Sequence, residues 1–347
     1  MLVPKARIPW RHLVLFGWMP SSLKKWAYRA LLGYKIGRRV TLSFGSVVIG
    51  DTVELGDDVE IGLLALVQGR RITIGRHSSI GTFTYVSCET IEIGEDAKIR
   101  EQVFIGGPQL PESRFTLGSR TIVLQMTYIN PTMPVTIGDD TGIGGHCLIF
   151  THGAWLNALD GYPVTYEPVT LGKSVWLPWR VFIMPGTTIG DGSVIGADSL
   201  VSGVIPPRSL AVGSPAKVIR SAPDFPRPMD PAQRSALVAR IVSEFERYLS
   251  HAGVTMAGDT AQRTYARGSH ASRLLWRRGS SAVPSTSAGD TVLSETPLTD
   301  AERAAYRAAG VHWLDLGGRT RSRNGSALTE ELAAFLGRYG IRLARDG

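Results

Sequence analysis

A histidine and two carboxylates lie at one break in the regular pattern of the central chain. His152 follows an apolar run that ends at Ile149, and the next apolar residue in step is Leu171. The intervening segment, THGAWLNALDGYPVTYEP, contains Asp160 and Glu167 as its only acids. Imidazole, with an unperturbed pKa of about 6.5, can take a proton from a hydroxyl or an amine near neutral pH. We therefore expect His152 to act as a general base, with one of the two acids orienting it.

The elements that must position this loop are short and repeated. Aliphatic-Gly pairs recur every 19 residues at Ile36-Gly37, Leu55-Gly56, Ile74-Gly75 and Ile93-Gly94, and beyond Leu171 the aliphatic positions recur every six residues. Six residues make a strand and a turn, and three such units close a triangular coil of about 18 residues whose core is buried only by stacking. The pattern predicts a mainly β fold, a parallel β-helix, with one extra residue bulged at a corner of each 19-residue coil.

Residues 36–220 resemble the hexapeptide-repeat acyltransferases, which are left-handed parallel β-helices. The resemblance rests on VTIGDDTGIG from Val135, on VTLGKSVWLPWRVFIMPGTTIGDGSVIGADSL from Val169, and on the tail IPPRSLAVGSPAKVIR. The tail is most similar to that of sugar O-acetyltransferases of surface polysaccharide synthesis. By this resemblance His152 matches the family's catalytic histidine, and Asn130 matches an asparagine near the acceptor. A turn formed by Asn130 and the following proline is the alternative.

The same resemblance implies an acyl donor and an assembly. In the family, coenzyme A lies in a groove between two subunits near the last coils, and three chains form a homotrimer. The donor would be acetyl-CoA, and the matching positions are Trp176, Ala197, Ser202, Lys217 and Arg220. Lys217 and Arg220 are suitable partners for its phosphates.

Two departures from the family pattern concern the donor. Leu177-Pro178-Trp179 stands where the family commonly has Ile-Gly after the tryptophan, and Ser202-Gly203 stands where it commonly has Thr-Lys. The first adds bulk near the pantetheine path, and the second removes a possible phosphate contact. Both leave the exact donor open.

A zinc enzyme is the metal-dependent alternative, because γ-class carbonic anhydrases share this fold. Catalytic zinc needs about three converging protein ligands and an open position. Only His77, His146 and His152 fall within the repeats, and His77 lies several coils away. His146 precedes His152 by one side of the triangle, so we expect it on an adjacent face in a structural role. We expect no metal. The two cysteines, Cys88 and Cys147, exclude a disulfide-rich scaffold and a four-cysteine zinc site.

Positive charge is concentrated in the first 50 residues. They contain nine of the 38 basic residues and no acid, since the first acid is Asp51, and they include Trp10, Trp18 and Trp26. Basic and Trp-rich composition is typical of a segment lying on an anionic bilayer. We expect membrane-surface contact through residues 1–39, with a basic cap on the first coil as the alternative. No nucleic-acid-binding motif accompanies the charge, so no nucleic-acid partner is expected.

The sequence contains no apolar run of about 20 residues that would span a membrane and no clear signal-peptide cleavage site. We expect a cytoplasmic protein, peripheral at the inner membrane face. The chain divides into a basic amphipathic segment (1–35), the β-helix (36–220), a linker and helix (221–290) and a small α/β unit (291–347). The helix is predicted by an apolar stripe at Leu237, Ile241, Phe245 and Leu249.

Function does not follow from the fold alone, and three hypotheses result. The first is transfer of an acetyl group from acetyl-CoA to a hydroxyl of a sugar or lipid-linked glycan, with His152 as base. The second is N-acylation of an amino sugar, with acyl-CoA or acyl carrier protein as donor. The third is a non-catalytic β-helix scaffold with the C-terminal unit as an interaction module.

Overall fold

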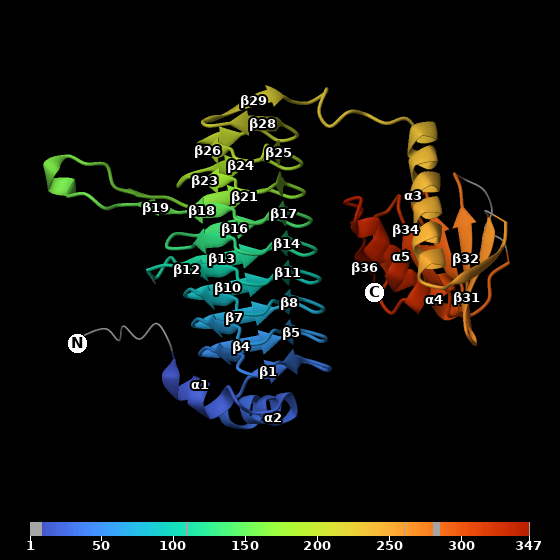
Figure 1. The fold of residues 1–347 in the computed structure, drawn as a ribbon, viewed down its shortest axis with the longest axis horizontal. Coiled ribbons are helices and arrows are strands. Elements are labelled where there is room, and N and C mark those ends of the chain that lie inside the picture. The colour runs from blue at the N-terminus through green and yellow to red at the C-terminus, as the bar shows by residue number, and fades with distance from the viewer. Residues whose placement is uncertain (1–8, 109, 260, 280–284, 347) are drawn as a thin grey trace. The chain divides into compact units, whose positions relative to one another are not determined.

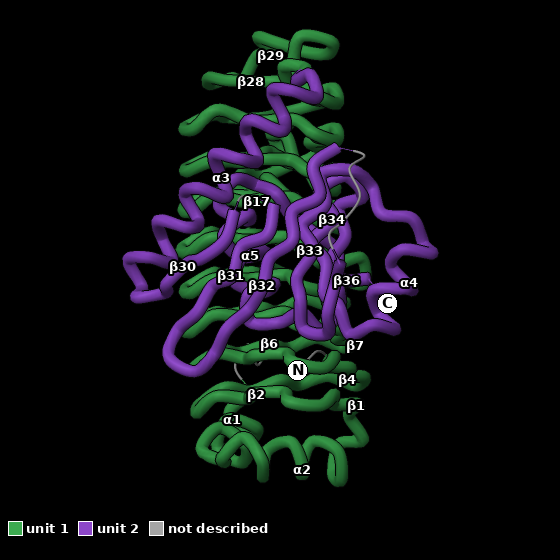
Figure 2. Tube along the Cα trace, turned by 90° about the vertical axis from the view of Figure 1, so that its right-hand side faces the viewer, with its two compact units in different colours: residues 1–228 green, residues 229–347 purple. Residues whose placement is uncertain are grey.

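The computed structural model describes residues 9–108, 110–259, 261–279 and 285–346. The chain forms two compact units, Met1–Pro228 and Met229–Gly347 (Figure 2).

The first unit is a prism of three parallel sheets (Figure 1). Each turn of the chain adds one strand to each sheet. The first sheet contains β1 (Lys35–Ile36), β4 (Thr52–Leu55), β7 (Arg71–Ile74), β10 (Thr90–Ile93), β13 (Arg114–Leu117), β16 (Val135–Ile137), β21 (Val169–Leu171), β24 (Thr188–Ile189) and β27 (Val204–Ile205). The second contains β2 (Thr41–Leu42), β5 (Glu60–Ile61), β8 (Ser79–Ile80), β11 (Lys98–Ile99), β14 (Ile122–Val123), β17 (Gly142–Ile143), β22 (Trp176–Leu177), β25 (Val194–Ile195), β28 (Leu210–Gly213) and β29 (Ala216–Arg220). The third contains β3 (Val47–Ile49), β6 (Leu66–Gln68), β9 (Tyr85–Ser87), β12 (Phe104–Gly106), β15 (Tyr128–Asn130), β18 (Leu148–Phe150), β23 (Phe182–Ile183) and β26 (Leu200–Val201).

The core is a column of aliphatic side chains inside this prism. In one coil Ile74, Ile80 and Val86 point inward from the first, second and third sheets, and all three are buried. Corresponding strands of successive coils pair in register, so Ile74 lies between Leu55 and Ile93. The predicted mainly β fold, a left-handed parallel β-helix, is confirmed.

The three edges of the prism differ, and the difference positions the candidate site. The first edge joins the first and second sheets, the second edge joins the second and third, and the third edge leads from the third sheet to the next coil. Buried residues are seven apart across the third edge, as from Val86 to Ile93, but six apart across the first two, as from Ile74 to Val86 through Ile80. The extra residue of each 19-residue coil therefore lies at the third edge. Longer connections also follow β12, β15 and β18 on this edge.

Two helices close the N-terminal end of the prism, α1 (Trp10–Phe16) and α2 (Ser21–Leu32) (Figure 1). The fully buried Lys24 ammonium donates to the carbonyl oxygens of Ser43 and Ser46, at 3.0 and 2.8 Å. Lys25 donates to the carbonyl of Val40, and Arg29 donates to carbonyls of residues 36 and 37. A terminal coil would otherwise expose unpaired acceptors that invite pairing with another chain. These basic residues therefore cap the first coil.

Three further basic residues of the N-terminal segment are paired with acids one coil away. Lys35 bonds to Glu54, Arg38 to Asp57 and Arg39 to Asp58. Six of the nine cations thus serve the fold, as the basic-cap alternative predicted. Lys5 and Arg7 lie outside the described residues.

Replacing Lys24 with alanine is expected to destabilise the protein by about 2–4 kcal/mol, because buried acceptors lose their donor and the stem leaves a void. Urea denaturation measures this. Lys35→Ala is the matched control, since its side chain is exposed and its single surface ion pair contributes at most about 1 kcal/mol. Equal losses in both variants would contradict the capping role.

The same residue gives a dependence of stability on pH. Burial lowers the pKa of Lys24 to about 8, whereas an unfolded lysine titrates near 10.4. Between these values the unfolded state binds more protons, so stability rises with pH. The stability of the wild type relative to Lys24→Met should therefore increase from pH 8 to 10.

The second unit is an α/β layer built on a seven-stranded sheet. Its strands lie in the order β30 (Thr255–Gly258), β31 (Gln262–Arg267), β32 (His270–Arg277), β33 (Thr291–Ser294), β34 (His312–Asp315), β35 (Thr320–Ser322) and β36 (Ala344–Asp346). The helices are α3 (Pro231–His251), α4 (Asp300–Ala308) and α5 (Ala327–Gly337). Ile241, Phe245 and Leu249 of the predicted α3 stripe are buried and share a core cluster with α5.

The expected boundary at residue 290 runs through this sheet. β30, β31 and β32 fall in a segment that the sequence indicated as linker-like, yet β32 pairs with β33 in parallel. The segment is poor in aliphatic residues because its outer strands face solvent, and only positions such as Tyr265 and Leu275 are buried.

Among the described residues, none of the helices combines the length and the apolar character that a membrane-spanning helix needs.

Candidate functional site

His152 stands where a long arm leaves the third edge. The arm, residues 152–168, begins with β19 (His152–Gly153), which pairs with β20 (Thr165–Tyr166), and it carries a short 3-10 helix, η1 (Ala158–Asp160) (Figure 1). His152 lies opposite Tyr166, and their rings stack with centroids 5.7 Å apart. The arm's two strands thus hold the imidazole against an aromatic face at the mouth of the loop.

One nitrogen of this imidazole is buried without a hydrogen bond. Nδ1 of His152 has no partner among the described residues. A neutral imidazole that accepts a proton on Nε2 must carry its other proton on Nδ1, and that proton needs an acceptor. Leaving a buried polar group unpaired costs about 1–3 kcal/mol. Within one chain, the described side chains and backbone therefore leave Nδ1 of His152 available to a hydrogen-bond partner from outside the chain.

Neither predicted orienting acid supplies that group. Asp160 lies on η1 and accepts a hydrogen bond from Asn157 at 2.9 Å. The Glu167 carboxylate lies against Gly186, where an added side chain would collide with it. No hydrogen bond joins either acid to His152 within the described part of the chain.

Asn130 lies directly beside the start of the arm, on β15. Its Oδ1 accepts hydrogen bonds from the amide and the hydroxyl of Thr132, at 3.1 and 2.6 Å. Its carbonyl accepts from the hydroxyl of Thr151, which also accepts from the amide of Met133. These bonds hold the turn between β15 and β16 and tie it to Thr151, the residue directly before His152. A direct role of Asn130 toward an acceptor stays a prediction.

The three histidines of the repeats lie on three different edges. His77 is at the first edge, 3.5 Å from Asp58, and His146 is at the second edge beside Trp179. His152 is at the third. One chain therefore does not bring them together, and no cluster of three metal-ligating side chains occurs among the residues that the structure describes.

Trp176 lies on the outer face of the second sheet, over Gly142. A Cβ on Gly142 would stand 2.6 Å from the Trp176 ring, so the glycine makes room for it. Trp179, at the second edge, covers Gly145 in the same way. The two tryptophans and His146 form a partly exposed aromatic strip.

The remaining predicted donor residues lie near the end of the prism. Lys217 and Arg220 are exposed on β29, which pairs antiparallel with β28 at the end of the second sheet. Neither forms an ion pair with another described residue. Ala197 is at the second edge, and Ser202 is at the third edge, two coils beyond His152.

The predicted site residues therefore fall into two groups on opposite sides of one prism. His152, Asn130 and Ser202 lie along the third edge, whereas Trp176, Lys217 and Arg220 lie on the second sheet. In a triangular prism the third edge faces away from the second sheet. One chain alone does not bring both groups together.

Two features near His152 escaped the sequence prediction. The arm carries Trp155 and Leu159 with 96% and 94% of their surfaces exposed. A row of aromatic rings also runs along the third sheet, with centroids 4.8–5.5 Å apart between neighbours, through Tyr85, Phe104, Tyr128, Phe150 and Phe182. The first four rings are stacked, and the ring of Phe182 is tilted against that of Phe150. Four of these aromatic residues directly precede the inward aliphatic residue of their strand, and Phe150 directly follows Ile149. That pattern could have revealed the ladder.

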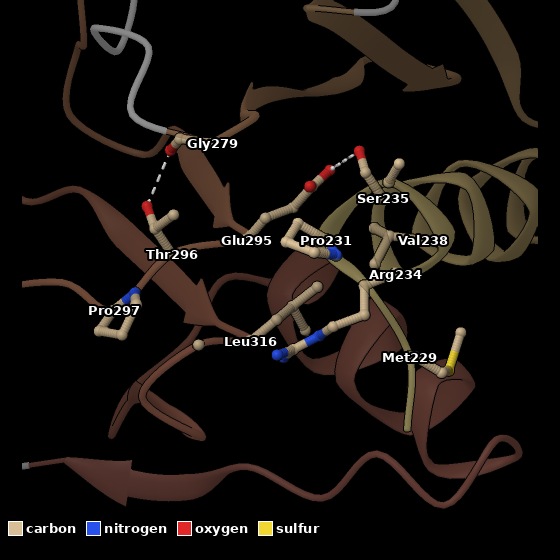
Figure 3. A pocket seen from close by; sticks show the side chains of 12 residues that line it. Met229, Pro231, Arg234, Ser235, Val238, Gly279, Glu295, Thr296, Pro297 and Leu316 are labelled. Atoms are coloured by element: carbon tan, nitrogen blue, oxygen red, sulfur yellow. Dashed lines mark hydrogen bonds between the residues drawn. The ribbon is translucent and has the colours of Figure 1, made fainter. Parts of the chain in front are cut away.

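The second unit has a cavity of its own, of about 530 Å³ (Figure 3). It is lined by the first turns of α3 and by the loops after β33 and β34. Glu295 lies at its wall and accepts hydrogen bonds from Ser235 and from the Trp276 indole, at 3.2 and 2.9 Å. The carboxyl ends of parallel strands are a common place for ligands in α/β sheets.

Comparisons with known proteins agree with the repeat fold. No family model matches the chain. It is 33% identical to galactoside O-acetyltransferase of Escherichia coli K12 over 142 residues, which cover 38% of this chain and 64% of that enzyme. It is 26% identical to a "probable acetyltransferase" of Mycobacterium tuberculosis over 224 residues, which cover 63% of this chain and 64% of that protein. The chain thus spans just under two thirds of either relative.

Solved structures were compared with the chain as well. A hexapeptide-repeat acetyltransferase of Vibrio cholerae, solved with acetyl coenzyme A, is 20% identical and covers 62% of this chain and 85% of its own, with a TM-score of 0.31. The sequence similarity to named acetyltransferases and the β-helical architecture agree on one assignment. Through its first unit, this chain is similar in sequence to named acetyltransferases and has the β-helical fold of the hexapeptide-repeat family that its sequence resembles.

Proposed function

We propose that the protein transfers an acetyl group from acetyl-CoA to a hydroxyl of a sugar or a lipid-linked glycan, with His152 as general base. The observation that carries the proposal is the placement of His152. It stands at the root of the only long arm of the described prism, on the one irregular edge, with its ring held against Tyr166. Galactoside O-acetyltransferase, a sugar-modifying enzyme, is among the relatives. Since acetyl-CoA is an intracellular metabolite, the cytoplasm is the expected location.

The reaction needs one base and no covalent enzyme intermediate. His152 takes the proton of the acceptor hydroxyl as its oxygen attacks the thioester carbonyl. The negative charge that develops on the carbonyl oxygen needs hydrogen-bond donors, and backbone N–H groups at the corners of the coils are suited to this role. Collapse of the tetrahedral intermediate breaks the C–S bond, and the imidazolium returns the proton to the departing thiolate.

The proposed site is shared between copies of the chain. Because the third edge and the second sheet face apart within one prism, a neighbouring copy must bring its second sheet to the His152 edge. The neighbour would then supply Trp176, Lys217 and Arg220 for coenzyme A, and it could also provide the missing acceptor for Nδ1 of His152. A homotrimer, in which the His152 edge of each chain meets the second sheet of the next chain, satisfies this requirement.

Calorimetric titration with acetyl-CoA tests the proposal. Micromolar binding with one site per chain supports it. No binding would contradict the acetyl-CoA donor and favour acyl carrier protein, and a failure with the carrier protein as well would favour a non-catalytic scaffold.

The double variant Lys217→Ala/Arg220→Ala is expected to bind acetyl-CoA about tenfold more weakly, because two charge-assisted contacts to phosphates are lost. The difference should shrink as salt rises, since exposed charges are screened. Lys173→Ala, which removes another exposed lysine of the same unit, is the control. Unchanged affinity in the double variant would show that the phosphates bind elsewhere.

A further inference from the structure

The helices α1 and α2 and the turn between them carry three exposed tryptophans. Trp10, Trp18 and Trp26 have 67%, 61% and 59% of their surfaces exposed. Aliphatic side chains stand exposed among them, namely Val14, Leu15, Leu23 and Leu31. These seven residues define the apolar cap face.

The fold does not require this face. The opposite faces of the same helices already anchor them, because Phe16, Ala27 and Tyr28 are buried against the first coil. The Tyr28 hydroxyl accepts from the amide of Val48, and the amide of Gly45 donates to the carbonyl of Gly17. Several large apolar side chains exposed on one short segment usually mark an interaction site.

Charge indicates what covers the face. Residues 1–50 contain no acid, so nothing negative comes from the helices that carry the cap face. Arg11 is exposed next to Trp10, and Lys5 and Arg7 precede it in the sequence. Tryptophan prefers the membrane–water interface, where its ring lies among headgroups, and basic residues are attracted to anionic lipids. At 7 and 12 residues the helices are too short to span a bilayer of about 30 Å.

We propose that the apolar cap face docks the protein on the surface of an anionic lipid bilayer. The helices lie flat on the interface with their tryptophans among the headgroups. Because both helices cover the end of the prism (Figure 1), the prism axis points away from the membrane.

Docking through the apolar cap face determines how far the candidate site stands from the membrane surface. The third sheet runs from β3 through β6, β9, β12 and β15 to β18, which is five strand spacings. At about 4.8 Å per spacing, His152 stands about 24 Å beyond the first coil, and the helical layer adds about 10 Å. This step rests on the proposed function: a membrane-linked acceptor would be modified about 30–35 Å from the interface, on a sugar distant from its lipid.

Vesicle co-sedimentation of the full chain tests the docking. Vesicles of phosphatidylcholine with about one third phosphatidylglycerol should bind the wild type at least tenfold more strongly than they bind Trp10→Ser/Trp18→Ser/Trp26→Ser, in line with the apolar area removed. Pure phosphatidylcholine should bind the wild type more weakly than the anionic vesicles. Phe83→Ser, which removes another exposed aromatic ring from the prism, should bind like the wild type.

Failure of the wild type to bind anionic vesicles, or equal binding by the triple variant, would overturn the proposal. If the triple variant instead lowers the assembly state in sedimentation analysis, the face covers a second copy of the chain, which also overturns it. Thermal unfolding verifies that the variant is folded. Acetyl-CoA titration of the same variant should be unchanged, so failure of membrane docking and failure of the proposed function give different results.

Discussion

Replacing His152 with alanine is expected to lower kcat by about 10²–10⁴-fold, the usual contribution of a general base. The loss follows because the acceptor hydroxyl would have to attack without giving up its proton to the enzyme. The fold should persist, since His152 lies outside the prism core and forms no hydrogen bond through Nδ1 to another described residue. Steady-state kinetics and thermal unfolding measure the two effects.

A matched histidine separates catalysis from structure. His146 lies six residues earlier at the second edge, where its backbone φ is 56°. Asparagine tolerates this left-handed conformation, so His146→Asn should keep turnover close to that of the wild type. Similar losses in both variants, or near-normal turnover in His152→Ala, would contradict the assignment of the base.

The second large effect is expected in the arm. The double variant Trp155→Ala/Leu159→Ala should dissociate the proposed homotrimer and lower turnover by at least about 100-fold. Two apolar side chains exposed by more than nine tenths are unfavourable in a lone chain, and burying such side chains contributes about 1.5–3 kcal/mol each. Loss of the neighbour also removes the donor residues that one prism holds on its opposite side.

Sedimentation velocity and steady-state kinetics check this prediction together. Trp26→Ala/Leu31→Ala is the matched control, because it removes the same two residue types from the cap face. This control should leave the sedimentation coefficient unchanged, and it should leave kcat with a water-soluble acceptor unchanged. An arm variant that stays assembled and active would show that the arm does not join two chains.

The repeat was predictable because its cause is local and recurs. Each inward aliphatic residue, such as Ile183 or Ile189, stacks on its equivalent one coil away, so the spacing in the sequence is the spacing of the structure. The break before Leu171 likewise indicated an arm, because no strand can continue without its inward residue. The placement of His152 at the root of that arm followed directly.

Features that depend on contacts between distant segments of the chain were not predictable in the same way. The sequence does not show that Lys217 and His152 lie on opposite sides of the prism, since that follows only from counting edges around a closed coil. The buried Nδ1 of His152 and the inward turn of the Lys24 ammonium depend on contacts between segments distant in the sequence. The sequence did not predict strand β31, because its side chains are mostly polar and its stability comes from pairing with both neighbouring strands.

The most direct measurement is the release of free coenzyme A thiol from acetyl-CoA, followed with and without a sugar acceptor such as a galactoside or an oligosaccharide. The account predicts thiol release that depends on the acceptor in the wild type and is lost in His152→Ala. Acceptor-independent release of equal rate, or acceptor-dependent release that survives the loss of His152, would contradict it.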